Sequence, residues 1–282
     1  MNDSRRRALV NVASAWAAKQ GLFSVQAAVG ERACVNAATY ASLCAPVHAS
    51  DRQLALATTF TVIFFWLDDA DPRELAELLA EPVARMPVLS HWRADARELD
   101  ACRPELTRAW SESLRIYLAA LGDELALDRA AITVAQQLDL RRRNAFIDPY
   151  LDLWFALVDA APLAAECARA RWIGRELIIY ANDLGSLDRD LAASRERPEL
   201  NLAITMAREQ GITAELAARS LVEQHDALCA ELRALLTTIA AVAPAWAGVL
   251  REVVIGNVLA MRALAERYAG STARLDALAL PL

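Results

Sequence analysis

The chain has 282 residues, of which 56% are hydrophobic, and its formal net charge is −6 with a pI near 5.3. This negative charge argues against binding to nucleic acids or to anionic membrane surfaces, so an anionic substrate would need metal ions or a local cluster of arginines. Five scattered cysteines, odd in number and without close pairing, argue against a disulfide framework and against a zinc site. They favour a reducing compartment, and we expect a cytoplasmic protein.

Membrane insertion is not expected, in spite of the high hydrophobic fraction. The apolar run from Leu54 to Leu67 is shorter than the ~20 residues that a spanning helix needs. The segment from Ala8 to Lys19 lacks the uniform apolar core and the cleavage site of a signal peptide. Its pattern instead predicts an ordinary helix, the first element of the chain.

Helices are predicted along the rest of the chain as well. Glycine and proline are sparse, helix-forming residues dominate, and no stretch shows the alternation of a strand. Breaks between helices are predicted at Gly21, Pro46, Pro72, Pro82 to Pro87, Pro104, Gly122, Pro149, Pro162, Pro198, Gly211 and Pro244. No internal repeat or long linker divides the chain, so we expect one all-α domain over residues 1–282.

Two helix starts can be predicted in more detail. Asp148 followed by Pro149 is typical of an N-cap with proline at the first helical position. Thr213, which follows the break at Gly211, is likewise expected to begin a helix. Residues 192–199 (AASRERPE) are the best candidate for a mobile loop between helices.

The first motif, residues 64–72 (FFWLDDADP), is an apolar helix that runs directly into three carboxylates and is stopped by Pro72. Helical spacing puts Phe64 and Phe65 on the face of Asp68. Carboxylates at a helix C-terminus oppose the helix dipole, and magnesium, which prefers hard oxygen ligands, would neutralise them. Taken alone, such a cluster is more often a solvated helix end followed by a turn.

The second motif, residues 182–190 (NDLGSLDRD), follows an apolar helical stretch over residues 172–181. Asn182, Ser186 and Asp190 are spaced four residues apart, so they lie along one face of a helix. An amide oxygen, a hydroxyl and a carboxylate form a plausible ligand set for magnesium. A polar stripe facing solvent is the alternative for this motif taken alone.

Together the two motifs resemble those of the class I terpene synthases. In that family an aspartate-rich motif and an NDxxSxxx(E/D) triad face each other and hold three magnesium ions. The resemblance implies an all-α, single-domain class I terpenoid synthase bundle around a central apolar pocket. The metal ligands that it implies are Asp68, Asp69, Asn182, Ser186 and Asp190.

Other residues resemble the family's contacts to the substrate diphosphate. Arg189 stands where the family often has a basic contact, and Arg267 with Tyr268 looks like its arginine–tyrosine pair. Gly256 and Asn257 match the two residues that often precede this pair.

A diphosphate-sensing arginine is also implied by the resemblance. Arg141 is the first candidate and Arg142 the second, although basic residues here would also complement the dipole of their own helix. The threonine and glycine that usually follow in the family are replaced by Asn144, Ala145 and Phe146.

The chain departs from the family pattern at three further positions. Its first motif is the short DDxD form, which leaves Asp69 and Asp71 as alternatives for the second metal contact. Asp190 replaces the commoner glutamate and shortens that ligand by one methylene. Ala260 stands where a tryptophan is usual and would enlarge or reshape the pocket.

Aromatic rings could line this pocket, because their faces attract carbocations. Most aromatic residues in helices are core residues, so each is only a candidate. The candidates are Phe64, Phe65, Trp154, Phe155 and Trp246.

The activity implied by the resemblance is magnesium-dependent ionisation of farnesyl or geranylgeranyl diphosphate, followed by cyclisation to a terpene hydrocarbon or alcohol. The catalytic residues are then Asp68, Asn182, Ser186, Asp190, Arg267 and Tyr268. A chain-elongating prenyltransferase is the nearest alternative, but its second DDxxD motif reads NDLGS here. A non-catalytic helical scaffold is the alternative from another class. A homodimer is one assembly that the resemblance implies.

Overall fold

All regular secondary structure in the described part of the chain is helical, as the composition predicts. The computed structural model describes residues 3–23, 27–80, 86–264 and 272–282. The helices are α1 (Asp3–Lys19), α2 (Ala27–Cys44), α3 (Asp51–Asp68), α4 (Pro72–Ala80), α5 (Pro87–Asp95), the short 3-10 helix η2 (Arg97–Asp100), α6 (Pro104–Leu125), α7 (Val134–Asn144), α8 (Ile147–Leu157), α9 (Glu166–Ala193), α10 (Leu202–Gln210), α11 (Ala214–Ala240), α12 (Pro244–Ala263) and α13 (Thr272–Asp276). The prediction of an all-α fold is confirmed.

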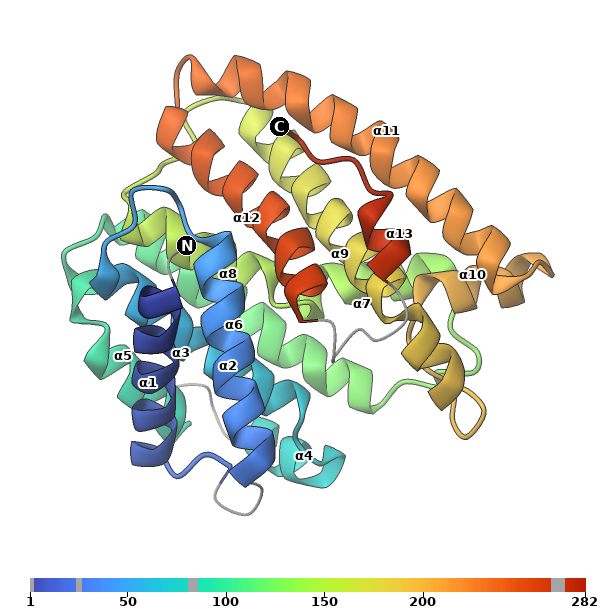
Figure 1. The fold of residues 1–282 in the computed structure, drawn as a ribbon, viewed down its shortest axis with the longest axis horizontal. Coiled ribbons are helices and arrows are strands. Elements are labelled where there is room, and N and C mark those ends of the chain that lie inside the picture. Colours follow the sequence, from blue (N-terminus) through green and yellow to red (C-terminus); the bar gives the residue numbers. More distant parts are fainter. Residues whose placement is uncertain (1–2, 24–26, 81–85, 265–271) are drawn as a thin grey trace.

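Helix α9 has most of the other helices of the C-terminal half around it. It packs against α10, α11, α12 and α13, and it also touches α7 and α8. Figure 1 shows α9 beside α12, with α11 along the outer edge of the bundle. In the N-terminal half, α2 packs against α1, α3 and α12. Helix α12 therefore joins the two halves.

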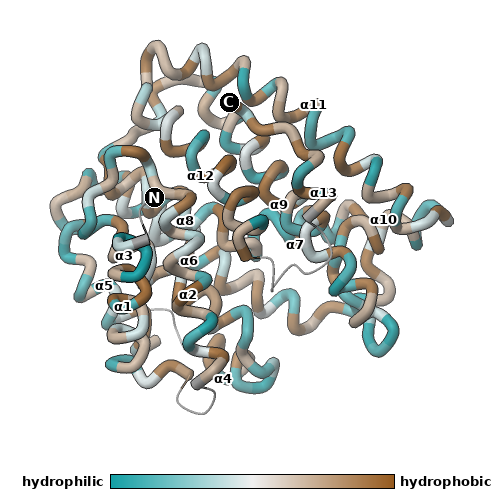
Figure 2. The backbone as a smooth tube through the Cα atoms, viewed as in Figure 1, coloured by the Kyte–Doolittle hydropathy of each residue, from teal (hydrophilic) through white to brown (hydrophobic). Residues whose placement is uncertain are grey.

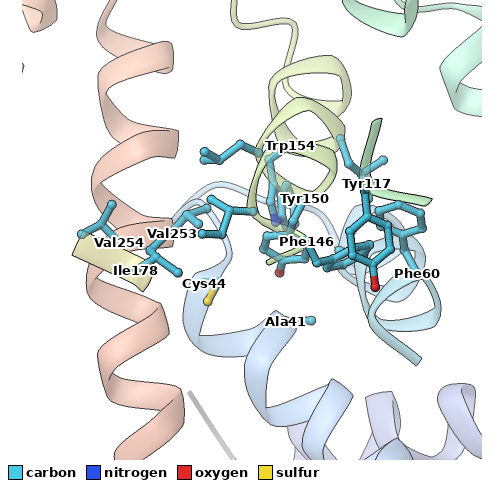
Figure 3. Close-up of a cluster of buried hydrophobic side chains, with 14 of the residues drawn as sticks. Ala41, Cys44, Phe60, Tyr117, Phe146, Tyr150, Trp154, Ile178, Val253 and Val254 are labelled. Atoms are coloured by element: carbon cyan, nitrogen blue, oxygen red, sulfur yellow. The ribbon is translucent and has the colours of Figure 1, made fainter. Parts of the chain in front are cut away.

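Aromatic rings fill the interior between α3, α5 and α6. The ring centroid of Phe60 lies 4.7 Å from that of Trp92 and 5.8 Å from that of Trp110. Figure 3 shows Phe60 in the same buried cluster as Tyr117 and Phe146. Figure 2 shows hydrophobic and hydrophilic residues alternating along α11, at the outer edge of the bundle, and hydrophilic residues in the loop that follows α9.

The ends of the helices match the sequence in several places. Helix α3 ends at Asp68, and α4 begins at Pro72. Gly211 adopts the left-handed conformation (φ +66°) that ends α10, and the Thr213 side chain accepts a hydrogen bond from the Leu216 amide at the start of α11. The predicted start at Thr213 is confirmed.

The predicted N-cap at Asp148 is wrong. Helix α8 begins at Ile147, after an N-cap at Phe146, so Asp148 lies inside its first turn. The Asp148 carboxylate pairs with Arg171 and Arg175 of α9, both at 2.8 Å. These ion pairs between helices take the carboxylate that capping would have used. Pro149 still fits, because amides in the first helical turn have no partner within the helix.

Gly256 lies where α12 crosses α2. A Cβ atom at this position would be 2.2 Å from the Leu43 carbonyl oxygen and 2.5 Å from the Cys44 Cα atom. Only glycine permits such a close approach of one helix to the backbone of another. This residue of the Gly-Asn pair therefore has a structural reason for its identity.

The five cysteines form no disulfide, which agrees with their scattered positions. Among the described helices, none is both long enough and apolar enough to span a bilayer.

Candidate active site

A cavity of about 200 Å³ lies where α2, α3, α7, α9 and α12 meet, and ionic groups surround it. Its lining includes the carboxylates of Asp68, Glu124, Asp190 and Glu199 and the guanidinium groups of Arg129, Arg141 and Arg189. Aromatic and aliphatic side chains complete it, among them Tyr40, Phe64, Phe65, Phe146, Ile178, Ile179, Met261 and Leu264. The cavity thus combines groups that can hold an anion or a cation with apolar surface.

The aspartates of the first motif differ in position. Asp68 is the last residue of α3 and lines the cavity, whereas Asp69, its C-cap, and Asp71 do not. The Asp71 carboxylate accepts a hydrogen bond of 2.8 Å from the Arg73 amide. Since this bond caps the start of α4, Asp71 serves the turn between the two helices. Asp69 remains a predicted ligand outside the cavity lining.

Asn182, Ser186 and Asp190 all lie on α9 and all line the cavity. The Ser186 hydroxyl donates to Asp190 Oδ2 over 2.5 Å, so two of the three predicted ligands are in direct contact. The other oxygen of Asp190 accepts a hydrogen bond of 3.0 Å from Arg189 Nε. The four-residue spacing therefore brings together an amide, a hydroxyl and a carboxylate, as predicted.

Asn201, which was not identified from the sequence, holds Ser186 and Asp190 in place by hydrogen bonds. It is fully buried and donates from Nδ2 to Asp190 Oδ2 at 3.0 Å and to Ser186 Oγ at 3.3 Å. The same amide bonds the Asp183 carbonyl oxygen at 2.7 Å, and its Oδ1 caps α10 through the Ala203 amide. Its position as an asparagine just before a helical stretch was the only signal in the sequence.

Arg141 lines the cavity and forms an ion pair with Asp183, with 2.6 Å between Nη2 and Oδ1. The same Nη2 donates to Asn182 Oδ1 at 3.3 Å. Burial raises the pKa of the Asp183 carboxyl, and the charge of Arg141 opposes this shift. Arg142 instead pairs with the buried Glu176 at 2.6 Å and does not line the cavity. Of the two candidate sensors, only Arg141 is therefore positioned to meet a ligand in the cavity.

A second network, also not identified from the sequence, lies at the cavity. Arg129 pairs with Glu124 at 3.0 Å and with Glu199 at 3.3 Å, and so joins the end of α6 to the loop after α9. Glu124 also accepts a hydrogen bond of 2.6 Å from Asn144 at the end of α7. These residues come from three separate segments, so no sequence spacing relates them.

The predicted aromatic contacts divide into two groups. Phe64 and Phe65 line the cavity, whereas Trp154, Phe155 and Trp246 are buried elsewhere in the core. Trp154 packs edge-on against Tyr150, and Phe155 stacks on Trp246. Phe146, which also lines the cavity, was not predicted as an aromatic contact. Arg267 and Tyr268 lie outside the described residues.

The donor set fits magnesium. Carboxylate, amide and hydroxyl oxygens are the hard ligands that this ion prefers, and the triad offers all three on one helical face. Within the described residues, no group of three or more His, Cys, Asp or Glu side chains could hold a metal. The triad contains only one carboxylate, so the site predicted there would bind the metal through mixed carboxylate, amide and hydroxyl oxygens.

The model of terpene synthase family 2, C-terminal metal binding, matches residues 46–231, more than half of the chain and a span that includes both motifs. The chain belongs to this family. It is therefore a class I terpene synthase, a lyase with a metal-binding domain. No curated protein matches the chain significantly.

Solved structures of terpene synthases share the fold of this family member. A linalool/nerolidol synthase from Streptomyces clavuligerus, in complex with 2-fluorogeranyl diphosphate, is 21% identical with a TM-score of 0.71, and the match covers 94% of this chain and 95% of that one. The 2-methylisoborneol synthase of Streptomyces coelicolor A3(2), in complex with Mg²⁺ and geranyl-S-thiolodiphosphate, is 18% identical with a TM-score of 0.75 and coverages of 95% and 94%. A single-substitution variant of cucumene synthase is 20% identical with a TM-score of 0.73 and coverages of 92% and 96%. The predicted terpene synthase fold is confirmed.

Proposed function

We propose that this terpene synthase ionises a linear prenyl diphosphate with the help of magnesium and releases a terpene hydrocarbon or alcohol. One observation carries the proposal. Asp68 from α3 and the triad from α9, far apart in the sequence, line the same cavity together with Arg141 and Arg189. Two structural relatives were solved with analogues of such diphosphates, which supports this substrate class.

Each group in the cavity has a role in this reaction. Asn182, Ser186 and Asp190 of α9, together with Asp68 of α3, would hold magnesium. When bound, it would supply Lewis acidity that stabilises the departing diphosphate. Arg141 and Arg189 neutralise further charge on that leaving group, in a site where such interactions are strong.

The apolar part of the cavity binds the hydrocarbon chain of the substrate. Phe64 and Phe65 line this part, and aromatic rings attract a cation by roughly 0.5–2 kcal/mol per contact. The remaining apolar walls keep water from the cation until the chain has rearranged. The unpaired state of all five cysteines fits a cytoplasmic location, which we propose as well.

The test is incubation of the purified protein with geranyl, farnesyl and geranylgeranyl diphosphates, with and without magnesium, followed by gas chromatography of the extract. A magnesium-dependent terpene is expected from the wild type. Asn182→Ala should lower turnover by at least about 100-fold, because changes around a metal ligand alone cost ~10–100-fold in affinity or activity.

Asn11→Ala, on the exposed surface of α1, is the control and should behave as the wild type. Full magnesium-dependent turnover by Asn182→Ala would contradict the assignment. Formation of a longer diphosphate when isopentenyl diphosphate is added would instead indicate a chain-elongating prenyltransferase.

A further inference from the structure

Phe146 lines the cavity at the break between α7 and α8. Its backbone is left-handed (φ +60°, ψ +7°), a conformation that costs a non-glycine residue roughly 1–2 kcal/mol. The side chain lines the cavity, yet only 5% of the residue is exposed to solvent. Since the local backbone disfavours this arrangement, the packing of the ring must maintain it.

The ring of Phe146 is in contact with aromatic rings from two other helices. It stacks on Phe64 at 4.7 Å between centroids with 15° between the planes. It lies 4.9 Å from Phe60 and 5.2 Å from Tyr117. Figure 3 shows Phe146 between Tyr150 and the pair formed by Phe60 and Tyr117. The ring thus sits at the boundary between the cavity and a closed aromatic core.

Buried aromatic residues pack behind this ring. Phe60 is fully buried, and Trp92 and Trp110 pack behind it with their ring centroids 5.4 Å apart. The cavity of about 200 Å³ is below the ~300–1,000 Å³ of typical ligand pockets, and part of it is lined by ionic groups. Little volume is therefore left for hydrocarbon.

We propose that Phe146 limits the length of the prenyl chain, so that the wild type prefers geranyl diphosphate to farnesyl diphosphate and excludes geranylgeranyl diphosphate. This inference rests on the proposed function and narrows its substrate. The ionic groups fix the diphosphate end of the substrate, so the added five-carbon units must fit against the apolar part of the lining, to which Phe146, Phe64 and Phe65 belong. Removal of the Phe146 ring would open space next to Phe60, Phe64 and Tyr117, which are its ring neighbours.

Phe146→Ala and Phe146→Leu test the inference, with Phe155→Ala as the matched control. Phe155 is a buried aromatic residue of the neighbouring α8, stacked on Trp246 at 5.2 Å and absent from the cavity lining. For each protein, kcat/KM is measured by diphosphate release with the three substrates in magnesium, and folding is checked by thermal unfolding.

We expect Phe146→Ala to raise the ratio of kcat/KM for farnesyl over geranyl diphosphate at least about tenfold, since a single methylene in a fitted pocket is worth roughly 10–200-fold. Phe146→Leu should shift the ratio in the same direction by less, and it decides the question if Phe146→Ala does not fold. Phe155→Ala should lose stability without changing the ratio.

Two kinds of failure are distinguishable. The inference about Phe146 is wrong, and the proposed function stands, if the wild type releases diphosphate but prefers farnesyl or geranylgeranyl to geranyl diphosphate. The same holds if both Phe146 variants keep the wild-type chain-length preference. If the folded wild type releases no diphosphate from any of the three, the proposed function fails, and the inference fails with it.

Discussion

Asn182, Ser186 and Asp190 could be grouped from the sequence because a four-residue spacing places side chains on one face of a helix. Their common position on α9 and at one cavity follows from that spacing. Asn201 could not be grouped with them, because its contacts depend on the path of the chain after α9. Loop paths are not encoded in a residue period, so the supporting residue was found only in the structure.

Asn201→Ala should weaken magnesium binding. The variant loses the amide that fixes Ser186 and Asp190, and loss of such an outer partner costs ~10–100-fold in metal affinity or activity. The magnesium concentration for half-maximal activity should rise by that factor. Because the same side chain caps α10, the free energy of unfolding should also fall by about 1 kcal/mol.

Thr213→Ala separates these two effects. Thr213 caps α11 in the same way but does not touch the triad. It should lose about 1 kcal/mol of stability and keep the wild-type magnesium dependence. Equal magnesium dependence in the two variants would show that Asn201 acts only as a helix cap.

The helices themselves were largely predictable, since breaks at residues such as Pro72 and Gly211 follow from local backbone chemistry. The start of α8 was not, because Asp148 is drawn into ion pairs with α9 rather than used as a cap. Contacts between helices determine where α8 begins, and a local sequence pattern contains no information about such contacts. The close crossing of α2 and α12 could not be predicted for the same reason.

Gly256→Ala should destabilise the protein by roughly 1–3 kcal/mol, because the new methyl group would overlap the α2 backbone at Leu43 and Cys44. A backbone cannot move aside as a flexible side chain could. Gly248→Ala, on the same helix, is the control. No atom lies within 4 Å of its Cβ position, so alanine should stabilise α12 by roughly 0.5–1 kcal/mol. Denaturant unfolding measures both changes, and a neutral Gly256→Ala would mean that α2 and α12 can separate at little cost.

For the whole molecule, the fold class could be predicted because helical composition and two motifs in order agree with one family. The volume of the cavity could not. It depends on how Phe146 packs against rings from α3 and α6, which is a property of the assembled core. The resemblance implied farnesyl or geranylgeranyl diphosphate, whereas the role proposed for Phe146 predicts a shorter substrate.

Acid should destabilise the whole fold through His225. This residue of α11 is 1% exposed, and burial lowers the pKa of its imidazole below the ordinary 6.5, although the hydrogen bond to Asp226 opposes the shift. A lowered pKa means that the unfolded chain binds the proton more tightly than the folded one. The stability that comes from the neutral ring is therefore complete above pH 6.5 and is lost as the pH falls below that value.

His225→Gln should flatten this part of the stability curve, measured as the free energy of unfolding in denaturant between about pH 5 and 7.5. His48→Gln, on the exposed surface, is the control and should keep the wild-type slope. Identical slopes in wild type and His225→Gln would assign the acid sensitivity to other groups.

Helix α12 has a further consequence for engineering of the product spectrum. Its cavity face carries Asn257 and Met261, whereas Gly256 points at α2. One face thus holds α12 against α2, and the other lines the cavity, where Asn257 also donates a hydrogen bond of 3.2 Å to the Tyr40 hydroxyl of α2. A mutant library at Met261 that keeps Gly256 and Asn257 can vary the shape of the cavity while the contacts of α12 with α2 are kept.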